Sequence, residues 1–271
     1  MTAGPLPLAV VADADVYGAK AVSLGVALRA GLPVPGGTAL PAGLVARAAE
    51  DAAAREVVRD AAAALGGPLA VRSSAVGEDG ARSSFAGQHL TVLNVEDPEE
   101  AVAAVLRVAD SACAPSALAY RRARGDPAAA GCGVVLQRLV APTVAGVLFS
   151  RDPVTGADQL VVEASWALGE AVVEGLVTPD LFRLDRDGRL LESVVGVKDR
   201  AVVPCPGGGT ATVAVDGGRA RRPCLTDADL AALADLAQRC DALFGDPSDV
   251  EWAIPGGAPV LLQRRPITTL A

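Results

Sequence analysis

The feature that most constrains the fold of this chain is a change in sequence texture about halfway along it. The first part holds long Ala-rich stretches with charged residues spread along them, which are typical of helices. From 133 to 215, short runs of Val, Leu and Thr alternate with Gly, Pro and Asp, a pattern typical of strands joined by turns. We therefore expect an α+β chain with two parts, 1–130 and 131–271, and a boundary near 127–132.

Helices are expected where apolar residues recur at helical spacing between capping residues. These segments are 20–30, 42–65, 97–124 and 226–244. Asp97 and Thr226 are suitable N-caps, and Pro115 interrupts the third segment. Strands are expected at 69–71, at six places in the strand-rich part (133–140, 144–150, 159–164, 180–184, 190–197 and 210–215), and in a closing hairpin of 249–254 and 259–263.

Composition narrows the class of protein. The 271 residues include 24 Lys and Arg against 32 Asp and Glu, and this net charge of -8 argues against a nucleic-acid partner. A single His, His89, excludes zinc sites that need two His ligands. Five Cys without a C-x-x-C pair indicate reduced thiols in a cytoplasm. The most apolar stretch, Leu139–Phe149, is too short to span a bilayer, so we expect a soluble cytoplasmic protein without a membrane partner.

Two places in the first part are suited to binding phosphate. Lys20 is one of only two lysines, and its compact ammonium group suits a phosphate oxygen. Arg72 ends a short strand and opens a polar loop that contains Gly87, and the backbone amides of such loops can hold phosphates. Neither a P-loop nor a Rossmann motif is present. The alternatives are a solvated cation at a helix start and an ordinary surface loop.

Two further places complete a possible nucleotide site. Gln137 lies on an apolar strand that could line an adenine pocket, or it is a buried amide satisfied by the protein. Glu251 and Gln263 lie on the closing strands, where alternation could place both on one face, and such oxygen ligands suit Mg²⁺. Arg265 follows on the same face and could reach a terminal phosphate. The alternative there is a paired salt bridge at the surface.

The chain also resembles a known family. The matching stretches fall in family order along nearly the whole chain: Gly18–Gly25 with Ala30–Pro35, Val71–Ala75, Glu78–Asp79, Ser84–Gln88 with Leu93–Asn94, Gly146–Gly156, Glu163–Glu170 with Pro179–Asp180, and Asp249–Ala253 with Leu262–Thr268. As a set they resemble the ATP-grasp nucleotide-binding domain of phosphoenolpyruvate synthase, pyruvate phosphate dikinase and rifampicin phosphotransferase.

This resemblance implies an α+β ATP-grasp fold, in which two α/β subdomains grip ATP between them. Lys20 and Arg72 would hold the ATP phosphates. Gly87 and Thr91 would belong to a mobile loop that closes over them, and Gln137 would lie at the adenine. The 1–130 part would be the N-terminal subdomain, and 131–271 the C-terminal subdomain with the metal-binding strands.

The resemblance also implies chemistry. Glu251 and Gln263 would bind Mg²⁺, and Arg265 would stabilise the phosphoryl group in transfer. In the family, ATP is cleaved to AMP and phosphate, and the β-phosphoryl group passes to a His on a swivelling domain, which carries it to a small-molecule acceptor. We therefore expect an ATP-dependent phosphotransferase of the kinase or dikinase type.

The sequence departs from the family pattern in ways that leave alternatives open. It ends soon after Thr268, without the swivelling domain, so we expect a separate phosphohistidine-bearing protein or domain. Direct phosphorylation of a small molecule, a non-catalytic ATP-binding regulatory module and an excised domain of a longer protein are the alternatives. Ala19 and Ala167 replace glycines common in the family, and because both are small we expect little loss. The acceptor, the products (AMP plus phosphate, or ADP) and the oligomeric state stay open.

Overall fold

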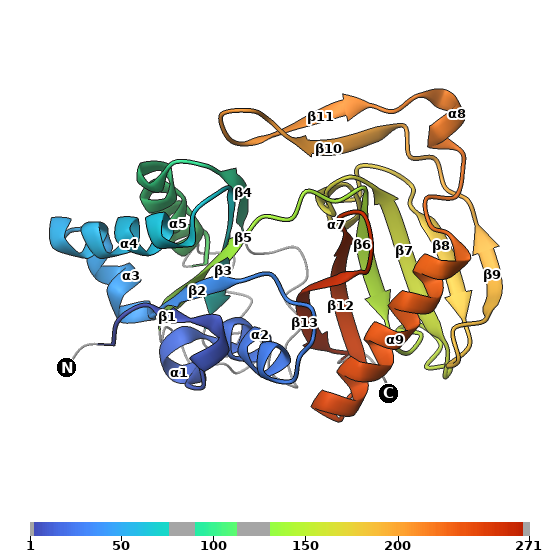
Figure 1. Cartoon of the computed structure of the whole chain (residues 1–271), viewed down its shortest axis with the longest axis horizontal. Helices are drawn as coiled ribbons and strands as arrows, with labels where there is room; N and C mark the ends of the chain where they lie inside the picture. Colours follow the sequence, from blue (N-terminus) through green and yellow to red (C-terminus); the bar gives the residue numbers. More distant parts are fainter. Residues whose placement is uncertain (1–2, 76–89, 113–130, 268–271) are drawn as a thin grey trace. The chain divides into compact units, whose positions relative to one another are not determined.

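The computed structural model describes residues 3–75, 90–112 and 131–267 (Figure 1). The chain forms two compact units. The first consists of Met1–Arg29, Pro35–Leu139 and Cys205–Gly209, and the second of Ala30–Val34, Val140–Pro204 and Thr210–Ala271. Neither unit is continuous in sequence. The division at 130 and 131 that the sequence suggested remains a prediction.

The first unit is built on a five-stranded antiparallel sheet with the order β1-β2-β5-β3-β4. Its strands are β1 (Leu6–Pro7), β2 (Gly37–Leu40), β3 (Leu69–Ala75), β4 (Thr91–Val95) and β5 (Cys132–Arg138). Every residue of β3 is buried, so both faces of this central strand are covered. Because side chains alternate along a strand, Val71 enters the hydrophobic core, and its neighbour Arg72 points to the opposite face.

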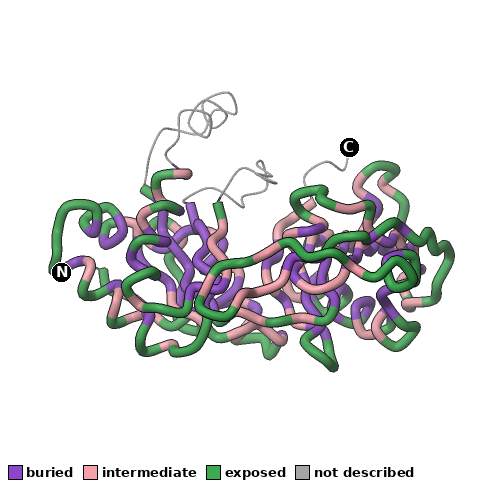
Figure 2. Tube along the Cα trace, turned by 90° about the horizontal axis from the view of Figure 1, so that it is seen from above, coloured by how far each residue is buried: buried purple, intermediate pink, exposed green. Residues whose placement is uncertain are grey.

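Helices cover this sheet. They are η1 (Leu8–Val10), α1 (Ala14–Tyr17), α2 (Ala19–Arg29), α3 (Ala42–Ala48), α4 (Ala52–Leu65) and α5 (Pro98–Ala112). The small and branched residues of α3, α4 and α5 pack with Val71, Val134 and Leu136 of the sheet in one core. Figure 2 shows the buried residues of the chain in purple. This core consists of Ala, Val and Leu residues.

The helical stretch predicted over 42–65 is two helices rather than one. The side chain of Asp51 accepts a hydrogen bond from the backbone N–H of Ala53 at 2.9 Å and begins α4. An acid in an Ala-rich run favours a new N-cap because its side chain competes for backbone donors. Asp97 caps α5 as predicted, accepting from the N–H of Glu99 at 2.7 Å. The rest of the helix predicted over 97–124 lies outside the described residues beyond Ala112.

The second unit is built on a six-stranded antiparallel sheet with the order β13-β12-β6-β7-β8-β9. Its strands are β6 (Val144–Phe149), β7 (Leu160–Trp166), β8 (Asp180–Leu184), β9 (Leu190–Val194), β12 (Ser248–Ile254) and β13 (Val260–Pro266). Two short helices, α7 (Glu170–Val173) and α8 (Gly217–Ala220), accompany the longer α9 (Asp227–Phe244). Thr226 caps α9 as predicted, and with Asp229 it forms a capping box. The expected α+β class is confirmed.

Helix α9 covers one face of this sheet (Figure 1). Arg264, which lies opposite Val250 across the hairpin, stacks over the ring of Phe244 at the end of α9. The face that includes Val250 is therefore the one under α9. The opposite face carries the side chains of Asp249, Glu251, Gln263, Arg265 and Glu163, and we call it the polar face.

β10 (Arg200–Pro204) and β11 (Thr210–Ala214) form a separate two-stranded sheet. Its turn, Cys205–Gly209, belongs to the first unit, where Asn94 holds it. The Asn94 Nδ2 atom donates to the carbonyls of Cys205 and Gly209, each at 2.7 Å. The backbone carbonyl of Asn94 accepts from the N–H of Gly209 at 2.9 Å. The sequence predicted no strand at 200–204.

Among the described residues, no helix combines the length and apolar character needed to cross a bilayer.

Candidate functional site

The predicted site residues fall into two groups, one in each unit. Lys20 belongs to the first group and lies in the first turn of α2, only 4% exposed. Its Nζ atom donates to the carbonyl of Ser73 on β3 at 2.6 Å, and the N–H of Ala21 donates to Ser74 Oγ at 3.0 Å. Lys20 is therefore not a solvated surface cation. The start of α2 is fixed to the strand that carries Arg72.

Gly18 makes this close approach possible. A Cβ atom at Gly18 would lie 1.8 Å from the carbonyl oxygen of Ser74, and the residue has a φ of 82°. Gly133 on β5 serves the same approach, because a Cβ there would lie 2.6 Å from the carbonyl oxygen of Tyr17. The glycines thus bring the turn before Lys20 against the strands, which places the ammonium at β3.

Arg72 and Gln137 meet on the first sheet, on the face opposite the core of α4 and α5. Arg72 Nη1 donates to Gln137 Oε1 at 3.4 Å, and the two side chains are 7% and 1% exposed. The Nε2 atom of Gln137 is buried and makes no hydrogen bond within the described residues. An amide donor left in this state is available to a bound molecule.

Thr91 begins β4 directly opposite Arg72 and is partly buried. It therefore lies beside the arginine predicted to bind phosphate. Gly87, the other residue predicted for the closing loop, lies outside the described residues, as does His89. The first unit thus places Lys20, Arg72, Gln137 and Thr91 along β3 and its two neighbouring strands.

The second group lies on the β12–β13 hairpin. Glu251 on β12 is the direct cross-strand partner of Gln263 on β13. Residues paired directly across strands point to the same face, so their side chains share the polar face. The register shifts at this point, because Trp252 pairs with Leu261 and Leu262 is an extra residue on β13. The hairpin therefore contains a β-bulge next to the two predicted metal ligands.

Arg265 lies on the same face between two carboxylates. The Nη2 atom of Arg265 is 3.5 Å from Glu251 Oε1 and 3.5 Å from Asp249 Oδ2. The sequence pattern had suggested no role for Asp249. Its burial, and to a lesser degree the neighbouring Glu251, raises its pKa to about 6 against the opposing effect of Arg265. Alternation along β12 with Glu251 was the signal that could have identified it.

A further carboxylate on the polar face is Glu163 of β7. Val147 of β6 is paired with Glu251 on one side and with Glu163 on the other, so all three side chains lie on one face. Burial raises the pKa of the Glu163 carboxyl. The sequence predicted this strand but attached no function to its acid.

The polar face has the donor types that Mg²⁺ requires. Mg²⁺ prefers oxygen ligands and usually takes one or two carboxylates, completing its shell with waters and phosphate oxygens. Glu251 and Gln263 offer a carboxylate and an amide oxygen on one face, with Asp249 beside them. In the described ranges, no three His, Cys, Asp or Glu side chains cluster as a protein-only metal cage would need. The residues fit a metal shared with a phosphate ligand.

Lys198, the second lysine, has a structural role instead. It forms an ion pair with Asp180, and both side chains are fully buried. Asp180 also accepts hydrogen bonds from the backbone N–H groups of Gly196 at 2.9 Å and Cys224 at 2.8 Å. A buried pair with these additional bonds holds the segment before β10 against β8.

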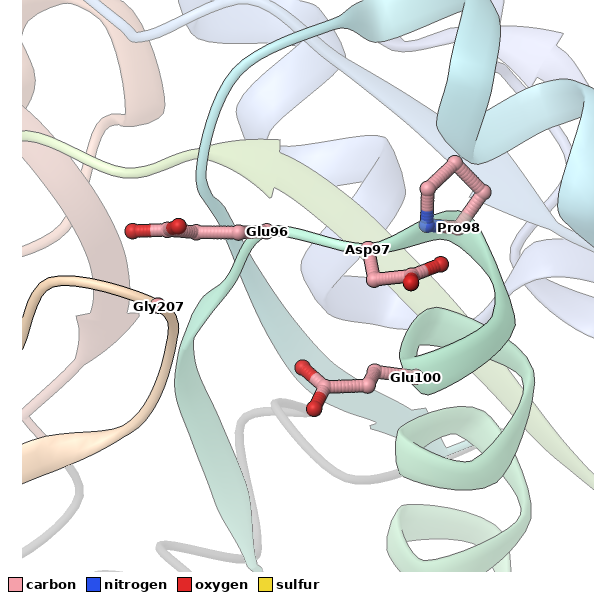
Figure 3. Close-up of a pocket in the computed structure, with 5 residues that line it drawn as sticks. All are labelled: Glu96, Asp97, Pro98, Glu100 and Gly207. Carbon is pink, nitrogen blue, oxygen red and sulfur yellow. The ribbon is translucent and has the colours of Figure 1, made fainter.

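One cavity in the described part is lined by none of the predicted site residues. It has a volume of about 420 Å³ and lies beside the start of α5 (Figure 3). Its lining residues are Glu96, Asp97, Pro98, Glu100 and Gly207. The three acidic residues that line this cavity would repel a polyphosphate. We therefore do not place the nucleotide there.

Comparison with known proteins identifies the family of this chain. A family model described as the pyruvate phosphate dikinase AMP/ATP-binding domain matches residues 47–271. The chain belongs to this family. The resemblance stated from the sequence motifs is thereby confirmed, and with it a domain type that binds AMP or ATP.

Relatives of this dikinase-family chain include phosphotransferases. A rifampicin phosphotransferase from Streptomyces sp is 41% identical over 239 residues, covering 88% of this chain and 27% of its own. A probable phosphoenolpyruvate synthase from Methanothermobacter thermautotrophicus is 41% identical over 204 residues, covering 74% and 30%. An uncharacterised phosphotransferase, YvkC, from Bacillus subtilis is 32% identical over 283 residues, covering 95% and 34%. The chain thus spans about a third or less of the length of these relatives.

Among solved structures, D-alanine–D-alanine ligase from Bacillus anthracis aligns with 94% of the chain and 59% of its own, with a TM-score of 0.40 and 11% identity. A likeness at this level adds nothing to the family assignment.

Proposed function

We propose that this chain binds Mg-ATP and transfers a phosphoryl group from it to a histidine on a separate swivelling domain or subunit. The observation that carries the proposal is the β12–β13 hairpin, where Glu251, Gln263 and Arg265 share one face. A carboxylate, an amide oxygen and a guanidinium group in this arrangement suit a metal-bound phosphate under transfer.

The first unit supplies nucleotide-binding groups in this proposal. Lys20 and Arg72 bind phosphate oxygens, and both are already ordered by contacts with β3 and Gln137. Gln137 serves the adenine, since its buried amide N–H has hydrogen-bonding capacity to spare. Thr91, with Gly87, belongs to the segment that closes over the phosphates. Ordered cationic groups reduce the reorganisation that binding would otherwise require.

The second unit supplies the groups at the phosphoryl being transferred. Glu251 and Gln263 hold Mg²⁺, which, when bound, neutralises charge on the phosphate oxygens. Arg265 donates hydrogen bonds to the same phosphoryl group and stabilises the charge that develops in transfer. The described residues then act by positioning and electrostatics, and the histidine of the partner provides the nucleophile.

The test supplies the chain with Mg²⁺, ATP and a separately produced histidine-bearing swivelling domain from a related rifampicin phosphotransferase. We expect phosphohistidine on the added domain by mass spectrometry, with AMP and phosphate as products by phosphorus NMR. Matched reactions with Glu251→Gln, and with Glu192→Gln on the exposed strand β9 as control, identify the contribution of the hairpin.

Other outcomes decide against this proposal. Multiple turnovers without the added domain, with ADP and a phosphorylated small molecule such as rifampicin, would indicate direct phosphorylation. Tight binding of ATP that is left intact in every mixture would indicate a non-catalytic regulatory module.

A further inference from the structure

The bulge in the β12–β13 hairpin gives the predicted metal ligands two possible registers. In the structure, Glu251 pairs with Gln263, and Leu262 is the additional residue of β13. A hairpin without a bulge would pair each residue in simple succession. Shifting β13 by one residue removes the bulge, and a shift of one residue turns every side chain of the shifted segment to the other face.

The shifted register would disable the polar face. Gln263 and Arg265 would turn toward α9, and Arg264 would take the place of Arg265 on the polar face. Because an arginine would still lie beside the carboxylates, the charge pattern of the polar face does not by itself reject this register. Contacts on the face under α9 must therefore select the observed register of β13.

Arg264 makes the contacts that select it. Its Nε atom donates to Ser248 Oγ at 3.0 Å, and its Nη2 atom donates to the carbonyl of Asp246 at 3.1 Å. Its guanidinium carbon lies 4.4 Å from the centre of the Phe244 ring. The side chain is only 7% exposed, so the shifted register would remove a buried guanidinium from all three groups.

We propose that Arg264 is a positioning residue that fixes the register of β13 and thereby keeps Gln263 and Arg265 on the polar face. The role of the two residues in metal and phosphate binding rests on the proposed function, whereas the register does not. Lysine cannot substitute fully, since an ammonium group over the ring of Phe244 lacks the planar fork that reaches both Ser248 and Asp246.

The experiment uses Arg264→Met in the full chain, because methionine keeps the apolar stem over Phe244 and removes the donors. NMR cross-strand contacts report the register directly. In the wild type we expect contacts between the backbones of Glu251 and Gln263, and in the variant we expect contacts from Glu251 to Leu262. Calorimetry of ATP with and without Mg²⁺ gives a second readout. We expect the gain in ATP affinity from Mg²⁺ to fall about tenfold, with Mg-free binding unchanged.

Three further variants keep the test decisive. Arg239→Met alters an exposed arginine of α9 paired with Asp235, and it should keep the wild-type register and affinity. Arg264→Lys should give an intermediate result. If Arg264→Met does not fold, Phe244→Leu removes only the ring and should move both readouts in the same direction.

Retention of the Glu251–Gln263 contact in both Arg264→Met and Phe244→Leu would overturn the positioning role. A wild-type chain that shows the contact but binds no ATP would instead refute the proposed function and leave the register assignment intact.

Discussion

Glu251 and Gln263 are direct cross-strand partners, and Arg265 lies within 3.5 Å of the Glu251 carboxylate on the same face. This relationship makes the hairpin the most sensitive part of the proposed site. We expect Glu251→Gln and Arg265→Ala each to lower phosphoryl transfer by about two to three orders of magnitude, because each removes charge stabilisation from the transition state. Steady-state rates with unchanged circular dichroism would check this, and near-wild-type rates for both would remove the assignment.

Lys20→Ala is expected to act on binding rather than on the chemical step. The ammonium group is buried and already ordered at the carbonyl of Ser73, so in the proposed site it would contact a phosphate without further ordering. We expect ATP affinity to fall about tenfold, the amount that a charged hydrogen bond of about 1.5 kcal/mol represents. Calorimetry measures it, with Arg47→Ala at an exposed site as the control. An equal loss in both variants would contradict the prediction.

Gly18→Ala should damage both stability and ATP binding. The added Cβ would lie 1.8 Å from the backbone of Ser74, which cannot rotate away, and the φ of 82° adds strain. We expect the free energy of unfolding to fall by at least about 2 kcal/mol in urea titrations. Gly43→Ala in α3 is the control, because its new Cβ meets nothing closer than the Arg47 side chain at 4.0 Å. A neutral Gly18→Ala would show that the turn can relax.

Ala167→Gly should stabilise the chain. The sequence led us to expect little loss at this position because alanine is small, but the structure gives Ala167 a φ of 61°, in the left-handed region. Glycine removes that strain, for a net gain of about 0.5–1 kcal/mol in the free energy of unfolding. Ala46→Gly, exposed in α3, should lose about 1 kcal/mol in the same thermal and urea measurements. A loss at both positions would mean that the backbone at Ala167 is not strained.

Asp152 should make stability depend on acid pH. Its carboxylate accepts from the N–H groups of Val154 at 2.9 Å and Thr155 at 3.0 Å and pairs with Arg183. The Thr155 backbone hydrogen bond is the largest of the effects that hold its pKa well below the ordinary value. The charged form is therefore favoured by folding, and its stabilisation is complete at neutral pH and is lost as pH falls below about 4.

Asp152→Asn should accordingly cost about 1–3 kcal/mol of unfolding free energy at pH 7 and much less at pH 3. Urea titrations across this range check the difference, with the exposed Asp158→Asn as the matched control. A cost that stays constant with pH would contradict an ionised Asp152 in the folded chain.

Local signals in the sequence were enough to place several elements. Thr226 and the spacing of leucines after it predicted α9, and Asp97 predicted the start of α5, because capping and periodicity act within a few residues. The same local rules missed the break at Asp51, since an N-cap inside an Ala-rich run competes with continued helix by a small margin.

Non-local relationships were harder to predict. Alternation suggested that Glu251 and Gln263 could share a face, but the bulge at Leu262 and the pairing order of the strands depend on contacts distant in sequence. Asp249 escaped notice because alternation identifies a face and not the residues that become buried on it. The strand β10 was missed because it depends on pairing with β11, and the glycine turn between the two strands is held by a hydrogen bond from the distant Asn94.

The Asn94 contact has a practical consequence for dissecting the molecule. A fragment cut at Leu139 would lack the Gly-rich loop whose carbonyls accept both N–H hydrogen bonds of the Asn94 side-chain amide, and this buried donor would lose its acceptors. Truncation of the gene at a single point therefore yields a first half in which the side-chain amide on β4 lacks its hydrogen-bond acceptors. A fragment meant to fold by itself would have to carry residues 205–209 grafted back in, for instance as a short appended peptide.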